Sequence, residues 1–122
     1  MIQKKIKMVI KRYTFILAML KKGKRSGYVW VRNRKVWIEI DDDMLVIVEI
    51  IREIIEREQT EWLRKLYKDI LKGEKDFQIL MDCPVERGKY YETKKRFFNK
   101  IYQCCICKGL VLYDEILNES IG

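Results

Sequence analysis

One segment of the chain limits the choice of fold more than any other, because its apolar residues change from helical to alternating spacing. In GYVWVRNRKVWIEI, residues 27 to 40, β-branched residues alternate with aromatic or charged ones on either side of the turn, which is typical of two paired strands. The apolar residues before and after this segment have helical spacing. The sequence therefore predicts a mainly α protein with one β-hairpin over residues 28 to 40, an α+β fold.

The predicted hairpin turns at Asn33-Arg34. Val31 would then lie opposite Val36, and Trp30 would lie opposite Trp37 as a cross-strand aromatic pair. The face expected to join the core carries Val29, Val31, Val36, Ile38 and Ile40. The other face carries Tyr28, Trp30, Arg32, Lys35, Trp37 and Glu39. This second face suits packing, self-association or capture of a protein partner through Trp30 and Trp37, and it also suits stacking on nucleic-acid bases.

Helical spacing predicts the remaining elements. A basic amphipathic helix within residues 1 to 22 is expected to run over 2 to 21 and to end at Gly23. The three Asp residues at 41 to 43 are expected to cap the next helix. Further helices are expected over 60 to 71, 74 to 82 and 86 to 108. Because no repeat or Ser-, Gly- or Pro-rich linker interrupts the chain, we expect one domain of residues 1 to 122, with a helical bundle over 42 to 108.

Charge is unevenly distributed along the 122 residues, whose formal net charge is +8. The first 35 residues hold 12 basic and no acidic side chains, whereas residues 36 to 86 are net acidic and residues 87 to 122 are again basic. Two basic surfaces around an acidic segment favour a polyanionic partner on one face and a different partner on the other. Simple solvation of these faces would give the same pattern.

The apolar runs are too short for a membrane protein. The longest near the start covers residues 15 to 20, whereas a span needs about 20 residues and no secretory signal is recognisable. We therefore expect a cytoplasmic protein with reduced thiols and no membrane partner. The Lys-rich face of the first helix would also suit a membrane surface, but its apolar stripe is better explained as core.

No motif predicts catalysis, a metal or a cofactor. Cys83 and the CCIC run at 104 to 107 provide four thiols, but the run lacks C-x2-C spacing and the chain has no His, which favours buried free cysteines over zinc. The three adjacent Asp residues lack the Gly-turned loop of a calcium site. Without His, a phosphate-binding Gly loop or a nucleophile elbow, we do not expect an enzyme.

Residues 74 to 108 have the pattern of a helix-turn-helix, in which the second helix enters the major groove of DNA. The short helix over 74 to 82 would be followed by a turn at 83 to 85 and a basic helix from Glu86. Apolar side chains would hold that helix on the domain, namely Tyr90, Phe97, Phe98, Ile101 and Cys105. The candidate DNA-contacting residues are Arg87, Lys89, Tyr91, Glu92, Lys94 and Lys95.

The segment GEKDFQILMDCPVERGKYYETKKRFFNKI resembles the fourth-region helix-turn-helix of bacterial sigma factors. It is more similar still to small phage transcriptional regulators of the RinA and ArpU type, over about residues 60 to 108. The opening Gly of that pattern falls on Gly73 and its first-helix apolar residue on Ile79. Pro84 stands where these families usually have Gly, Lys94 where they have an apolar residue, and Glu86 where they have a Ser or Thr cap.

The resemblance implies a sequence-specific DNA-binding transcriptional regulator, an activator that works with host RNA polymerase on double-stranded DNA. If a phage encodes the protein, the expected location is the cytoplasm of the host cell. The hairpin and the first helix lie outside the matched part, where a homodimer contact or a polymerase contact is expected. The alternative class is a small phage-type interaction module that binds polymerase or another host protein without specific DNA readout.

Overall fold

The computed structural model of the chain describes residues 2–72 and 86–111. Within these ranges it has five helices and one antiparallel two-stranded hairpin, so the expected mainly α fold with one hairpin is confirmed. The elements are α1 (Ile2–Lys11), α2 (Tyr13–Lys21), β1 (Ser26–Val31), β2 (Arg34–Glu39), α3 (Asp42–Arg57), α4 (Glu61–Leu71) and α6 (Arg87–Cys107). The predicted helix over 74 to 82 and the turn at 83 to 85 lie outside the described residues, and the helix-turn-helix therefore stays a prediction.

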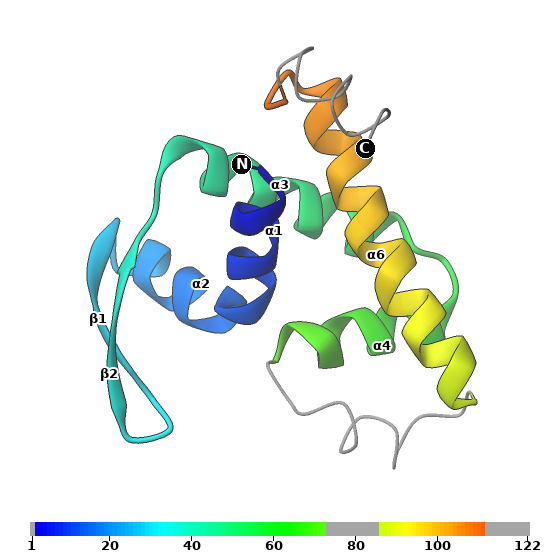
Figure 1. Cartoon of the computed structure of the whole chain (residues 1–122), viewed down its shortest axis with the longest axis horizontal. Coiled ribbons are helices and arrows are strands. Elements are labelled where there is room, and N and C mark those ends of the chain that lie inside the picture. Colours follow the sequence, from blue (N-terminus) through cyan, green and yellow to red (C-terminus); the bar gives the residue numbers. More distant parts are fainter. Residues whose placement is uncertain (1, 73–85, 112–122) are drawn as a thin grey trace.

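Helix α1 lies at the centre of the fold and contacts α3, α4 and α6. The hairpin lies on one side of this helical centre and α6 on the other, as Figure 1 shows. Helix α2 connects the helical centre to the hairpin, because it follows α1 directly and packs on β1. Helices α1 and α6, one from each basic part of the chain, therefore lie side by side, although the acidic segment separates them in the sequence.

The continuous helix predicted over residues 2 to 21 is wrong in one respect, since the helix bends at Arg12, where φ is −114° and ψ is 18°. Backbone hydrogen bonds continue across the bend, from Arg12 N–H to Met8 O and from Ile16 N–H to Arg12 O, both at 2.9 Å. No Pro or Gly is present there. The bend follows from packing, because α1 lies against α3 and α6 whereas α2 lies against the hairpin.

The predicted end of this helix at Gly23 is confirmed. Gly23 has φ of +73°, a conformation that side chains with a Cβ rarely adopt. The N–H groups of Gly23 and Lys24 donate to the carbonyls of Leu20 and Met19. This is the Schellman arrangement, which satisfies carbonyls left over at a helix end and turns the chain into β1.

The hairpin has the predicted faces but not the predicted register. Its two turn residues are Arg32 and Asn33, with φ of +50° and +66°, as a type I′ turn requires. Trp37 therefore pairs with Tyr28, and Trp30 pairs with Lys35, so the predicted Trp30–Trp37 pair is wrong. Compared with the prediction, the turn lies one residue earlier in the chain, and each residue of β1 pairs with a residue of β2 two positions earlier. A shift of two positions leaves every side chain on its expected face.

Helix α3 begins with the predicted cap. Met44 N–H donates to the Asp41 carboxylate at 2.8 Å. Lys5 of α1 reaches both Asp41 and Asp43, with Nζ 3.0 and 2.8 Å from their Oδ2 atoms. The acidic run thus caps one helix and binds the side chain of another, which fixes α1 against the start of α3.

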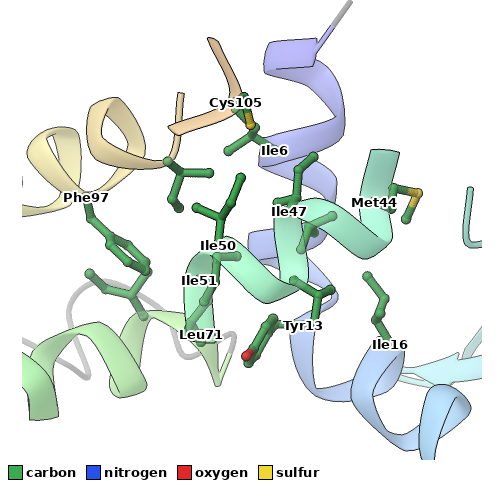
Figure 2. Packing of buried hydrophobic residues seen from close by; sticks show 14 of the residues in the cluster. Ile6, Tyr13, Ile16, Met44, Ile47, Ile50, Ile51, Leu71, Phe97 and Cys105 are labelled. Atoms are coloured by element: carbon green, nitrogen blue, oxygen red, sulfur yellow. The ribbon is translucent and has the colours of Figure 1, made fainter. Parts of the chain in front are cut away.

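The core is formed where α1, α3, α4 and α6 meet. Figure 2 shows Ile6 of α1 close to Cys105 of α6, with Ile47 and Ile50 of α3 nearby, and all four are buried. Phe97 of α6 stacks on Tyr67 of α4, with ring centroids 4.4 Å apart and planes at 15°, a geometry that aromatic pairs favour when it is offset. Helix α6 is therefore a structural part of the domain rather than an appended arm.

Candidate nucleic-acid interface

Helix α6 is held on the domain by one buried stripe. Its buried residues are Tyr90, Thr93, Phe97, Ile101 and Cys105, which follow the spacing of one helix face. The predicted anchor is confirmed, because Phe98 is half-buried and packs against the core and the other four predicted residues are buried. Thr93 was not expected in the core, and it is accommodated because its hydroxyl donates to Lys89 O at 2.8 Å.

The exposed surface of α6 carries most of the predicted DNA-contacting residues. Arg87, Lys89, Tyr91, Glu92 and Lys95 are all exposed. Lys94 is half-buried, so the structure separates it from the other five. Both predicted properties of this helix, a buried apolar stripe and an exposed cationic face, are present along its N-terminal half.

The first turn of α6 attracts anions. It contains no acidic residue, and its N-cap Glu86 makes no side-chain hydrogen bond to the free backbone N–H groups. Those N–H groups and the helix dipole favour a negative ligand. Arg87 lies 5.8 Å from the ring centroid of Tyr91, and Glu92 is paired with Arg96 at 3.0 Å. The helix therefore presents cations next to its Glu86 cap, and its one carboxylate within Arg87–Cys107 is paired with Arg96.

A second basic site was missed by sequence reasoning. A pocket of about 550 Å³ lies between the bend at Arg12 and the hairpin turn. Five of its lining residues are cationic, namely Lys11, Arg12, Arg32, Arg34 and Lys72. They come from three distant parts of the sequence, so only the fold brings them together. The charge of the first 35 residues was the one signal that pointed to this region.

A groove of similar volume between α3 and α6 has a mixed charge. Its lining includes Arg57, Arg96 and Lys100, but also Glu58. The Glu58 carboxylate lies 4.0 Å from Lys100 Nζ and accepts a hydrogen bond from Thr60 N–H. Because the negative charge of Glu58 offsets part of the positive charge in the groove, the groove favours an anion less than the pocket at the bend does.

The hairpin exposes its aromatic face. Tyr28, Trp30 and Trp37 are 61%, 68% and 51% exposed. Tyr28 contacts Trp37 edge-on at 4.9 Å between centroids, and Lys35 Nζ lies 4.6 Å from the Tyr28 ring centroid. Trp30 has no such aromatic neighbour among the described residues, and it instead lines the basic pocket.

The thiols on α6 differ in exposure. Cys105 is buried, Cys104 is half-buried and Cys107 is exposed, and all three are free. Burial raises the pKa of the Cys105 thiol to about 11. Cys83 lies outside the described residues. In the described ranges, no group of three or more Cys, Asp or Glu side chains is arranged to hold a metal ion, and no helix there is long and apolar enough to cross a membrane.

Comparisons with models of protein families, with curated proteins and with solved structures find no match. The similarity to sigma-type regulators therefore rests on the sequence motif alone.

Proposed function

We propose that this protein binds double-stranded DNA through the exposed face of α6 and acts as a sequence-specific transcriptional regulator. One observation carries the proposal: α6 is anchored by a buried stripe while Arg87, Lys89 and Lys95 are exposed on its N-terminal half. The major groove admits one α-helix, and its phosphate walls require cations at the start and flanks of that helix.

The exposed residues divide into two roles. Arg87, Lys89 and Lys95 would contact phosphates and set the orientation of the helix. Tyr91 and Glu92 lie between them in the sequence and would reach base edges, where a carboxylate accepts from the amino group of cytosine. Glu92 would exchange its ion pair with Arg96 for this contact, so Arg96 would become available for a phosphate.

The regulatory part of the proposal comes from the motif. Sequence similarity to phage activators supports a role with host RNA polymerase, and the exposed hairpin offers a surface for polymerase or for a second copy of the chain. An activator needs both a DNA contact and a polymerase contact, and α6 and the hairpin lie on opposite sides of α1 (Figure 1).

The test is selection of a binding site from a duplex library, followed by anisotropy titrations at several salt concentrations. We expect Arg87→Ala to weaken binding to the selected duplex by about tenfold and Lys95→Ala to lower the salt dependence by about one counterion. Lys100→Ala is the matched control, because it also removes a cation from α6, but one that is paired with Glu58. A library without a preferred sequence at moderate salt, or an equal loss with Lys100→Ala, would contradict the proposal.

The exposed Tyr28, Trp30 and Trp37 favour a second candidate, an interaction module that binds polymerase or another protein. Aromatic side chains are enriched at the centre of protein interfaces. In this case Trp37→Ala abolishes capture of purified bacterial RNA polymerase and leaves duplex affinity unchanged. Retention of polymerase by that variant would reject the hairpin as the polymerase contact.

A further inference from the structure

The pocket between the bend at Arg12 and the hairpin turn has an unusual charge. Lys11, Arg12, Arg32, Arg34 and Lys72 line it, and no acidic side chain belongs to its described lining. Its volume of about 550 Å³ falls in the range of small-ligand sites. A hollow enclosed by charges of one sign concentrates ions of the other sign.

Most of these charges are not neutralised within the described part of the chain. Lys72 is the exception, with Nζ 3.6 Å from Asp69 Oδ1. Lys11, Arg12, Arg32 and Arg34 have no ion pair with a carboxylate of residues 2–72 or 86–111. Since like charges repel, their convergence on one hollow favours an anionic ligand that would bind between them.

The pocket also has aromatic and apolar walls. Trp30, which is 68% exposed, and the half-buried Phe15 line it together with Val31 and Val36. A phosphate alone needs only cations. Cations beside an exposed indole are the combination that binds phosphate and stacks a base.

The turn that forms one edge of the pocket is conformationally costly. Arg32 has φ of +50°, a region that favours Gly, Asn or Asp at this position of a type I′ turn. Backbone strain of this kind is concentrated at functional sites. The guanidinium of Arg32 thus occupies a position where Gly, Asn or Asp would give a more stable turn.

We propose that this pocket binds a nucleotide unit, with the base against Trp30 and the phosphate between Arg12, Arg32 and Arg34. The unit comes either from an unpaired stretch of nucleic acid or from a free nucleotide. This site goes beyond the duplex binding proposed for α6 and does not rest on it, because α6 contributes no residue to the pocket. Figure 1 shows the hairpin and α6 on opposite sides of the molecule.

The experiment is an anisotropy titration of the full chain with a short labelled oligo(dT) at low salt. We expect Trp30→Ala to weaken binding by about tenfold, as for loss of one stacked base. Trp37→Ala is the matched control, since Trp37 is exposed on the same strand pair but does not line the pocket. For the cations, Arg34→Ala should weaken binding severalfold, and its neighbour Lys35→Ala should not.

A third variant separates binding from folding. Arg32→Asn keeps the turn, because Asn tolerates positive φ, and removes the charge. We expect it to bind oligo(dT) severalfold more weakly and to unfold at a temperature equal to or above that of the wild type. Weakened binding in a variant that remains folded excludes loss of the hairpin as the cause.

Competition identifies the source of the nucleotide. If unlabelled dTMP displaces labelled oligo(dT) only weakly, the ligand is a strand of several nucleotides. If dTMP displaces it as well as unlabelled oligo(dT) does, compared per binding site, the ligand is a free nucleotide. Both outcomes support the site. Displacement of oligo(dT) by dTMP that inorganic phosphate reproduces at the same concentration would overturn the proposal, as would wild-type affinity in both Trp30→Ala and Arg34→Ala. Duplex binding by the same variants is measured in parallel, so that either proposal can fail without the other.

Discussion

At the scale of single residues, the cysteines of α6 have very different environments within one helical turn. Cys105 is fully buried and Cys107 is exposed. Burial, followed by the neighbouring Cys104 and Asp43, raises the pKa of the Cys105 thiol to about 11. Only the thiolate reacts with alkylating agents, so both protonation and lack of access protect Cys105.

We expect iodoacetamide at about pH 8 to modify Cys107 rapidly in the folded protein and to leave Cys105 unmodified. Mass spectrometry of proteolytic peptides measures each site separately, and the same reaction in denaturant provides the control in which both react. Equal modification of the two sites under native conditions would show that α6 separates from α1.

At the scale of elements, the start of α3 links a helix cap to stability at low pH. Burial acts to raise the pKa of Asp41, but the hydrogen bond from Met44 N–H and the Lys5 ammonium outweigh it, so the pKa lies below its usual 3.8. The stabilisation that this carboxylate provides is therefore fully present at pH values above its usual pKa. It is lost as the pH falls through the lowered pKa of the folded protein.

We expect Asp41→Ala to lower the free energy of unfolding by about 1 kcal/mol at neutral pH through loss of the cap. The difference from the wild type should shrink as the pH falls below about 4, because protonation removes the same interaction. Urea unfolding at a series of pH values measures it. Asp42→Ala is the control, since the Asp42 side chain is 92% exposed and pairs with Arg25 and with no other side chain of residues 2–72 and 86–111. An equal loss in both variants would count against the cap.

Sequence patterns predicted the elements better than their connections. The period of the apolar residues predicted the hairpin faces and the buried stripe of α6, and the run of three Asp residues predicted the cap at Asp41. The period did not give the turn position, because Asn33 tolerates positive φ at either place of a two-residue turn and both registers keep the same faces. The bend at Arg12 was not predictable, since tertiary packing and not a local Pro or Gly causes it.

At the scale of the whole molecule, α1 is the element around which the others assemble. Ile6 is fully buried at the meeting of α1, α3 and α6. We expect Ile6→Ala to lower the free energy of unfolding by about 2–5 kcal/mol, the usual cost of a large buried cavity. Met8→Ala on the same helix should cost far less, because Met8 is 48% exposed. Urea unfolding measures both, and a similar effect of the two would contradict the central place of α1.

The basic pocket shows why a site can escape sequence analysis at this scale. Lys11, Arg32 and Lys72 belong to separate elements, and none is part of a motif. Their convergence depends on the bend at Arg12 and on the hairpin register, the two features that the sequence did not predict. The face of α6 was predictable because one helix carries all of it.

The central position of α1 also has a consequence for synthesis of the chain. Ile2, Ile6 and Val9 leave the ribosome well before α6, which covers them together with α3. The stripe of α1 therefore stays partly uncovered while the residues between α1 and α6 are translated. We expect this helix to be bound by a ribosome-associated chaperone during that interval.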